Sequence, residues 1–144
     1  MRRDPSLIPL SRHHHHGLSL CVLTEREISS APEAIDRLAA RAVNYFEVEL
    51  ILHFALEEQL LFPALPDFSG IAGYIADHRR MEALVGRLRQ NPTAETLLEF
   101  TALLRSHIRC EENELFEEVQ RRLPREILDA LGAENSRRDA PVCL

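Results

Sequence analysis

A ten-residue pattern with the residue types of a metal site occurs twice in this chain. Residues 53–62 (HFALEEQLLF) and 107–116 (HIRCEENELF) agree at five positions: the His, both Glu, the Leu and the Phe. Residues four apart on a helix lie on one face, so His53 should stack on Glu57. His107 should stack on Glu111 in the same way. Because both faces are otherwise apolar, these charged groups need partners or a metal. Two such pairs facing each other would supply the ligands of a dinuclear metal centre.

A third predicted helix carries another histidine on its apolar face. His78 falls on the apolar stripe of residues 71–88, and Glu82 follows it by four positions. Without a metal, such buried polar groups would need mutual hydrogen bonds, at a cost of roughly 1–3 kcal/mol for each one left unmet. We therefore interpret these side chains as metal ligands, with a metal-free hydrogen-bonded network as the alternative.

The four histidines at residues 13–16 supply the candidate ligand of the first helix. Leu18 and Val22 are predicted to face the core, which places His14 and His15 one turn earlier on the inward side. We favour His15 slightly, and expect the other to lie beside the ligand or on the rim of the cavity. The alternative interpretation is a remnant of an affinity tag or a surface metal-binding tract.

The second Glu of each motif is ambiguous. Glu58 and Glu112 follow their His by five residues, which turns them about 100° away from the His–Glu face. Alternatively, both Glu lie on the solvent-exposed face of their helix and bind no metal. Glu57 and Glu111 are favoured as ligands because they stack on their His, but the spacing does not decide which Glu of each pair contacts metal.

Length and composition limit the class of protein. The chain has 144 residues, enough for one domain with a sizeable core, and 45% of them are hydrophobic. The net charge of -6 argues against a nucleic-acid partner, which would select a basic surface. No apolar run is long enough to cross a membrane, and no secretory signal follows Arg2 and Arg3. Three Cys without a CxxC spacing indicate reduced thiols in a cytoplasmic protein.

Helical periodicity fills the middle of the chain, and no stretch alternates like a half-buried strand. We expect helices over about residues 11–29, 30–62, 69–91 and 93–123, and a short fifth helix over 124–131 that ends at Gly132. A capping box at residues 30–33 is predicted to start the second helix. The chain is therefore predicted to be all-α, with an antiparallel up-down-up-down four-helix bundle over residues 10–132. Residues 1–9 are predicted to form an extended arm and residues 133–144 a flexible tail.

The motifs resemble those of the hemerythrin-like family with its HHE cation-binding domain. Residues 53–63 and 107–116 look like the family's second- and fourth-helix signatures, and residues 77–82 (DHRRME) look like its third-helix motif. The resemblance covers roughly residues 10–120 and keeps the three motifs in the family's order. It implies a bundle that holds two iron ions, bridged by carboxylates and a solvent oxygen. Zinc and manganese also suit imidazole and carboxylate ligands, but the resemblance makes them less expected.

The resemblance also implies a role for each candidate ligand. The terminal nitrogen ligands would be His15 (or His14), His53, His78 and His107. Glu57 and Glu111 would bridge the two metals. Glu82 would be a terminal oxygen ligand or would block one coordination position.

One departure from the oxygen-carrying hemerythrins bears on function. Those proteins place a second His four residues after the third-helix His, where this chain has Glu82. An anionic oxygen ligand would stabilise ferric iron, which favours sensing, iron handling or redox chemistry over reversible oxygen carriage. Ferritin-like di-iron bundles use Glu-x-x-His pairs, and no His of this chain has a Glu three residues before it.

The expected function is the binding of a small molecule at the di-iron site: dioxygen, nitric oxide or peroxide. The expected partner is therefore a diatomic ligand, with neither nucleic acid nor a membrane involved. One alternative is a di-iron enzyme of peroxidase-like, nitric-oxide-reducing or ferroxidase-like type. The other is a bundle stabilised by structural zinc. The sequence leaves open whether the protein is an enzyme and which protein partners it has.

Overall fold

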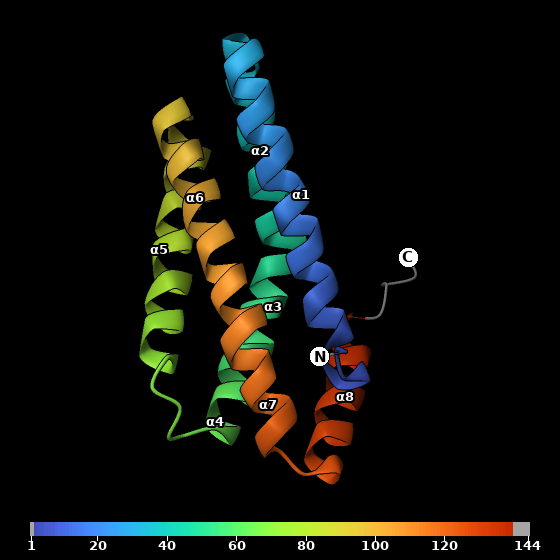
Figure 1. Ribbon diagram of the computed structural model, residues 1–144. Coiled ribbons are helices and arrows are strands. Elements are labelled where there is room, and N and C mark those ends of the chain that lie inside the picture. Colours follow the sequence, from blue (N-terminus) through green and yellow to red (C-terminus); the bar gives the residue numbers. More distant parts are fainter. Residues whose placement is uncertain (1, 140–144) are drawn as a thin grey trace.

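Four long helical rods and one shorter helix make up the structure, a computed structural model that describes residues 2–139 (Figure 1). The first and third rods are single helices, α1 (Ile8–Ser30) and α5 (Ile71–Gln90), and the shorter helix is α8 (Arg125–Asp139). The second rod joins α2 (Ile35–Tyr45), α3 (Ile51–Leu56) and α4 (Phe62–Ala64). The fourth joins α6 (Ala94–Cys110) and α7 (Phe116–Arg122). No strand occurs among the described residues, and the predicted all-α fold class is confirmed.

Short π-helical segments link the pieces of the second and fourth rods. They are η3 (Phe46–Leu50), η4 (Glu57–Leu61) and η5 (Glu111–Leu115). Two 3₁₀ turns, η1 (Pro5–Leu7) and η2 (Pro32–Ala34), precede α1 and α2. In Figure 1 the chain runs up α1, down α2 to α4, up α5 and down α6 to α7, so successive rods alternate in direction. Contacts of α6 with α1 and α5, and of α2 with α1 and α5, close the bundle.

Two apolar clusters fill the bundle, one toward each end. The first contains side chains such as Leu38, Phe54, Leu84 and Phe100, and the second contains Leu7, Leu61, Phe62, Leu115 and Phe116. Phe54 of the first cluster stacks on His78, with ring centroids 3.8 Å apart. Phe116 of the second cluster stacks on His14 at 5.2 Å. The two clusters therefore enclose a layer of polar side chains, and each contributes an aromatic ring to the wall around it.

Specific side chains decide how two predicted helix starts compare with the structure. Ser30 does not cap the second helix: it ends α1, and its hydroxyl donates to the carbonyl of Arg26. The predicted capping box is therefore wrong. The start predicted for the fourth rod is close, since the Thr93 hydroxyl caps α6 by accepting from the Thr96 N–H at 3.1 Å.

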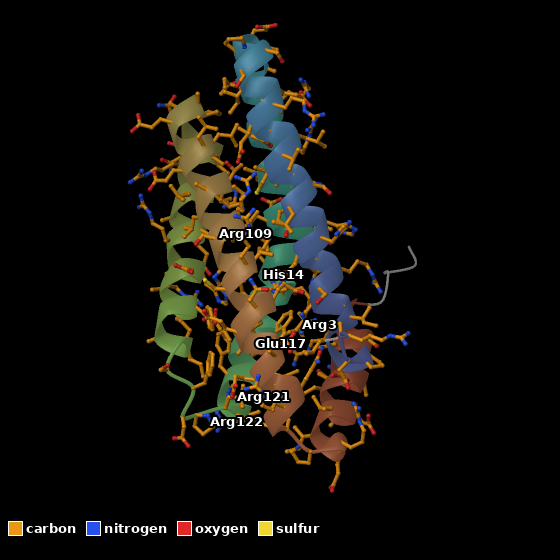
Figure 2. All side chains as sticks on the ribbon, in the orientation of Figure 1. Arg3, His14, Arg109, Glu117, Arg121 and Arg122 are labelled. Atoms are coloured by element: carbon orange, nitrogen blue, oxygen red, sulfur yellow. The ribbon has the colours of Figure 1, made fainter. Side chains whose placement is uncertain are left out.

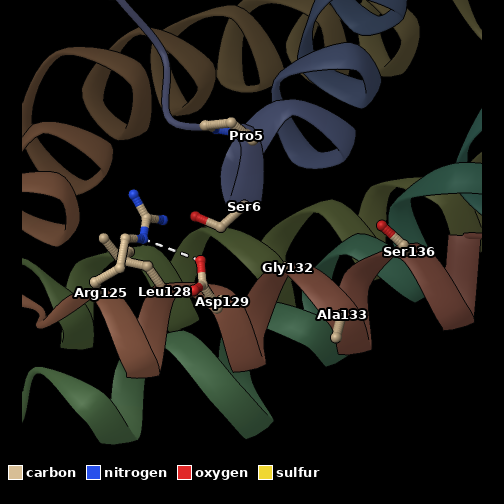
Figure 3. Close-up of a pocket in the computed structure, with 8 residues that line it drawn as sticks. All are labelled: Pro5, Ser6, Arg125, Leu128, Asp129, Gly132, Ala133 and Ser136. Carbon is tan, nitrogen blue, oxygen red and sulfur yellow. Dashed lines mark hydrogen bonds and ion pairs between the residues drawn. The ribbon is translucent and has the colours of Figure 1, made fainter.

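The ends of the chain are more helical than predicted. Asp4 caps η1 through the Ser6 N–H, and α1 begins at Ile8, so part of the predicted arm is helical and packed. At the other end, α8 continues past Gly132 to Asp139. Gly132 instead allows the backbone of Ser6 to pack closely against α8, since a Cβ at residue 132 would lie 3.1 Å from the Cα of Ser6 (Figure 3).

The division of the chain into arm, bundle and tail stays a prediction, and residues beyond Asp139 lie outside the described part. α8 fastens the start of the chain through two polar contacts. The Asn135 side chain donates to the Ser6 carbonyl at 2.7 Å, and Arg125 forms an ion pair with Asp4 at 2.8 Å. The N-terminal segment is thereby held against the end of the bundle that leads into α1.

Candidate metal centre

Six buried histidine and glutamate side chains meet between the two apolar clusters. They come from all four rods: His14 on α1, His53 and Glu57 on the second rod, His78 on α5, and His107 and Glu111 on the fourth rod. Each is at most 2% exposed. Figure 2 shows His14 about halfway along the bundle. The sequence predicted all six, and the structure brings them together.

The six side chains form two groups whose potential ligand atoms all lie within 4.8 Å of one another. The first group is His14, His53, Glu57 and Glu111; the second is Glu57, His78, His107 and Glu111. Each group therefore has two imidazoles of its own, while Glu57 and Glu111 belong to both. Two carboxylates shared by two sets of imidazoles are a suitable ligand arrangement for two bridged cations.

The distances show that the imidazole Nε2 atoms point at the shared carboxylates. In the first group, His14 Nε2 lies 2.9 Å from Glu111 Oε1, and His53 Nε2 lies 3.3 Å from Glu57 Oε1. In the second, His78 Nε2 lies 3.2 Å from Glu57 Oε1, and His107 Nε2 lies 3.2 Å from Glu111 Oε2. The ligand atoms of both groups thus converge on the same small volume.

Several of these inward atoms lack a hydrogen bond, which tests whether a metal suits the site. Among the described residues, no hydrogen-bond partner exists for Nε2 of His53, His78 and His107, for either carboxylate oxygen of Glu57, or for Oε2 of Glu111. Leaving so many buried polar atoms unsatisfied would cost about 1–3 kcal/mol each. Cations bound between these nitrogen and oxygen atoms would give each of them a partner, so the residues fit a metal centre.

The π-helical geometry begins at the inner Glu of each repeated motif. The Phe62 N–H donates to the Glu57 carbonyl, and the Phe116 N–H donates to the Glu111 carbonyl, each five residues back. Single π-helical turns inside α-helices often mark functional sites. The same irregularity at the same motif position in two rods indicates that the local backbone is adapted to place these carboxylates.

The outward nitrogens of three histidines are held by carboxylates. Nδ1 of His78 lies 2.7 Å from Glu58, Nδ1 of His14 lies 2.7 Å from Glu112, and Nδ1 of His107 lies 2.9 Å from Asp77. Metal-binding histidines commonly donate their second N–H to a carboxylate, which orients the ring and raises its basicity. Glu58 and Glu112, whose role was ambiguous in the sequence, therefore lie in an outer ring and support the histidines.

The carboxylates also change how the histidines titrate. Burial by itself would lower the pKa of His53, but Glu57 and Glu111 outweigh it and raise the pKa to about 9. Burial likewise opposes protonation of His107, but Glu111 and Asp77 raise its pKa to about 10. Burial would raise the pKa of Glu111, and His107 nevertheless holds it well below its usual range. The cluster therefore attracts positive charge, whether as protons or as metal ions.

Two predicted ligands lie elsewhere. His15 is exposed on the outer face of α1, and the preference for it over His14 is corrected. The phase of the first helix was misjudged because Val22, expected in the core, is 48% exposed. Glu82 is also corrected: its side chain is 40% exposed and pairs with Arg79 at 2.6 Å. Neither residue belongs to the two groups of ligand atoms.

Two supporting residues were not predicted from the sequence. Asp77, adjacent to His78 in the chain, supports His107 on the neighbouring rod. His13 is 2% exposed, and its Nδ1 lies 3.2 Å from Nδ1 of His53. The run of four histidines was the available signal for His13, but helical periodicity pointed to His14 and His15 instead.

The fold and the site together define an all-α helical bundle with a buried His/Glu cluster compatible with metal binding. A family model, the hemerythrin HHE cation binding domain, matches residues 9–119, and the chain belongs to this family. No curated protein and no solved structure matches the chain. Among the described residues, no helix has the length and apolar character needed to cross a membrane.

Proposed function

We propose that this protein is a non-haem di-iron protein that binds dioxygen or a related small molecule, such as nitric oxide or peroxide. The observation that carries the proposal is the pair of buried ligand groups that share Glu57 and Glu111. The unsatisfied inward atoms support it independently. Imidazole and carboxylate together suit iron, manganese or zinc, and the hemerythrin family favours iron.

In this proposal each ion has two imidazoles of its own. His14 and His53 would hold the first ion, and His78 and His107 the second. Glu57 and Glu111 would bridge them, since both carboxylates belong to both groups. When bound, a pair of ferrous ions would supply two electrons to a diatomic ligand, one from each ion.

The protein's own residues would exclude water and keep the ligands in place. Phe54 and Phe62 flank His78, at ring centroid distances of 3.8 and 5.9 Å, and Phe116 covers His14. An apolar wall of this kind admits a small uncharged molecule more readily than an ion, because an ion would lose its hydration without a compensating partner. This favours dioxygen or nitric oxide as the ligand.

We place the function in sensing, iron handling or redox protection in the cytoplasm. Cys21 and Cys110 are unpaired thiols, which suits a reducing compartment. The small molecule is the expected partner; nothing in the acidic composition favours nucleic acid.

The test is elemental analysis of protein purified without oxygen, followed by absorption spectra when air or nitric oxide is admitted. We expect two irons per chain and a new charge-transfer band without steady turnover. His14→Ala should lower the iron content, whereas His15→Ala, one position along α1 and exposed, should leave it unchanged. Steady consumption of a reductant would instead support a di-iron enzyme. Zinc with no spectral response would support a structural role for the metal.

A further inference from the structure

The outward nitrogen of His53 has a different partner from those of the other three inward histidines. Carboxylates hold Nδ1 of His14, His78 and His107, at 2.7 to 2.9 Å. Nδ1 of His53 instead meets the imidazole Nδ1 of His13, at 3.2 Å. The outer ring around the two ligand groups is therefore three carboxylates and one imidazole.

His13 is held in this position by its surroundings. Its side chain is 2% exposed, and its ring meets that of His53 edge-on with centroids 5.4 Å apart. Its carbonyl accepts a hydrogen bond from the Tyr45 hydroxyl at 2.7 Å. That hydroxyl fits because residue 17 is glycine: a Cβ on Gly17 would lie 2.5 Å from it. The backbone at His13 is thus anchored from α2.

The chemistry of His53 assigns the direction of this hydrogen bond. Its Nε2 faces Glu57 and Glu111, so ligation of a cation there requires the Nε2 lone pair. The ring proton then resides on Nδ1 and is donated to His13, whose Nδ1 accepts. A carboxylate acceptor carries a full negative charge and raises the basicity of the ligand, whereas an imidazole acceptor carries less negative charge and raises it less.

The two metal positions are otherwise closely matched in their outer partners. Glu112 supports His14 and also contacts Arg3, while Glu58 supports His78 and also contacts Arg79. Each position thus has one carboxylate that is paired with an arginine. Glu112 in addition accepts from the Ser11 hydroxyl at 2.9 Å. At the other histidine of each position the outer partners differ in kind: Asp77 lies behind His107, and His13 lies behind His53.

We propose that His13 is a positioning residue that makes the position of His14 and His53 the weaker and more readily exchanged of the two metal positions. The inference rests on the proposed dinuclear centre and adds to it an order of affinity for the two ions. Exchange of an outer partner of a metal-binding histidine typically changes metal affinity by about 10- to 100-fold, which is large enough to separate two binding steps.

The test is zinc titration of the metal-free full chain against a competing chelator, combined with NMR of the cadmium-loaded protein. Wild type should bind two zinc ions in two separate steps and show two cadmium resonances. His14→Ala should abolish the weaker step, which assigns it to the first position. Asp and Asn suit substitution at residue 13, because their Oδ lies as many bonds from the backbone as Nδ1 of His.

The three variants at residue 13 should give graded results. His13→Asn keeps a neutral acceptor and should retain the wild-type steps, while His13→Leu should weaken the first position alone by about 10-fold or more. His13→Asp should tighten it by a similar factor and shift one cadmium resonance while leaving the other. Asp77→Asn should weaken the second position and bring the two steps together. His16→Asn, on the exposed side of α1, serves as the matched control.

Three results would overturn the inference. His13→Leu could weaken both positions equally, which would indicate a general packing role, or His13→Asp could leave both steps unchanged. His14→Ala could remove the stronger step. Each of these results leaves the dinuclear centre standing, because wild type still binds two ions. A wild type that binds fewer than two ions would refute the proposed function and this inference together.

Discussion

Oε2 of Glu58 lies 2.7 Å from Nδ1 of His78, although the two residues are 20 positions apart on neighbouring rods. Glu58 is therefore an outer support for a histidine rather than one of the atoms that meet at the centre. Glu112, its counterpart in the second motif, supports His14 in the same way. Each repeat thus supplies one inner carboxylate that belongs to both groups of potential ligands and one outer carboxylate that holds the histidine of another rod.

Glu58→Gln should weaken metal binding without unfolding the bundle. The substitution removes the negative charge that lies against Nδ1 of His78 and leaves a side chain of nearly the same shape. We expect a loss of about 10-fold in zinc affinity, measured by competition with a chelator. Glu82→Gln is the matched control, because Glu82 contacts the same Arg79 yet is 40% exposed. Equal losses in both variants would show that the effect comes from Arg79 and not from His78.

The shared carboxylates should differ from the histidines in how many metals their loss removes. Glu57→Gln or Glu111→Gln changes a residue of both groups, so each should lower binding at both positions. His78→Ala changes the second group alone and should leave about one metal per chain. The metal-to-protein ratio after gel filtration in excess zinc distinguishes these outcomes. A Glu57→Gln variant that keeps one tightly bound ion would contradict the bridging role of that residue.

The repeated motif made the His and the inner Glu of each copy predictable, because both copies lie on long helices. A spacing of four fixes which side chains share a face. His53, Glu57, His107 and Glu111 therefore followed from the sequence without knowledge of how the rods meet. The outer supports did not follow, since each of them joins two rods and no local pattern records which rods are neighbours.

Errors in the first and last helices have local physical causes. The choice between His14 and His15 depended on the helix phase, and one residue changes the phase by about 100°. Val22 appeared to mark the inward face but is 48% exposed. Gly132 appeared to end a helix, whereas it lies within α8 where the backbone of Ser6 comes close. The π-helical turns also escaped prediction, because they leave the hydrophobic pattern almost unchanged.

Metal-free protein should lose stability as the pH rises from neutral into the alkaline range. His53 and His107 have ordinary pKa values of 6.5 when unfolded, and the folded chain raises them to about 9 and about 10. The folded state therefore binds more protons between these values, which stabilises it. The contribution is complete below pH 6.5 and disappears as the pH passes 9 to 10.

Denaturant unfolding in the presence of a chelator, repeated across this pH range, measures the effect. Combining His53→Gln with His107→Gln should flatten the dependence. His16→Gln should not, because His16 is half exposed and pairs with Glu49 at the surface. A free energy of unfolding that rises with pH in wild type would show that the two histidines are neutral in the metal-free fold.

Gly17→Ala should destabilise the protein through Tyr45. The added Cβ would lie 2.5 Å from the Tyr45 hydroxyl and 3.0 Å from Ile108, so the ring must move. Inserting a methyl group into packed structure costs about 1–3 kcal/mol, and here it also breaks the hydrogen bond to the His13 carbonyl.

Gly86→Ala is the control. Nothing lies within 4 Å of the position that its added Cβ would take, and the smaller loss of backbone entropy on folding should stabilise α5 by about 0.5–1 kcal/mol. Guanidinium unfolding of the two metal-free variants should therefore give shifts of opposite sign. If Gly17→Ala proves as stable as Gly86→Ala, Tyr45 does not need the space at Gly17, and the anchoring of His13 from α2 is refuted.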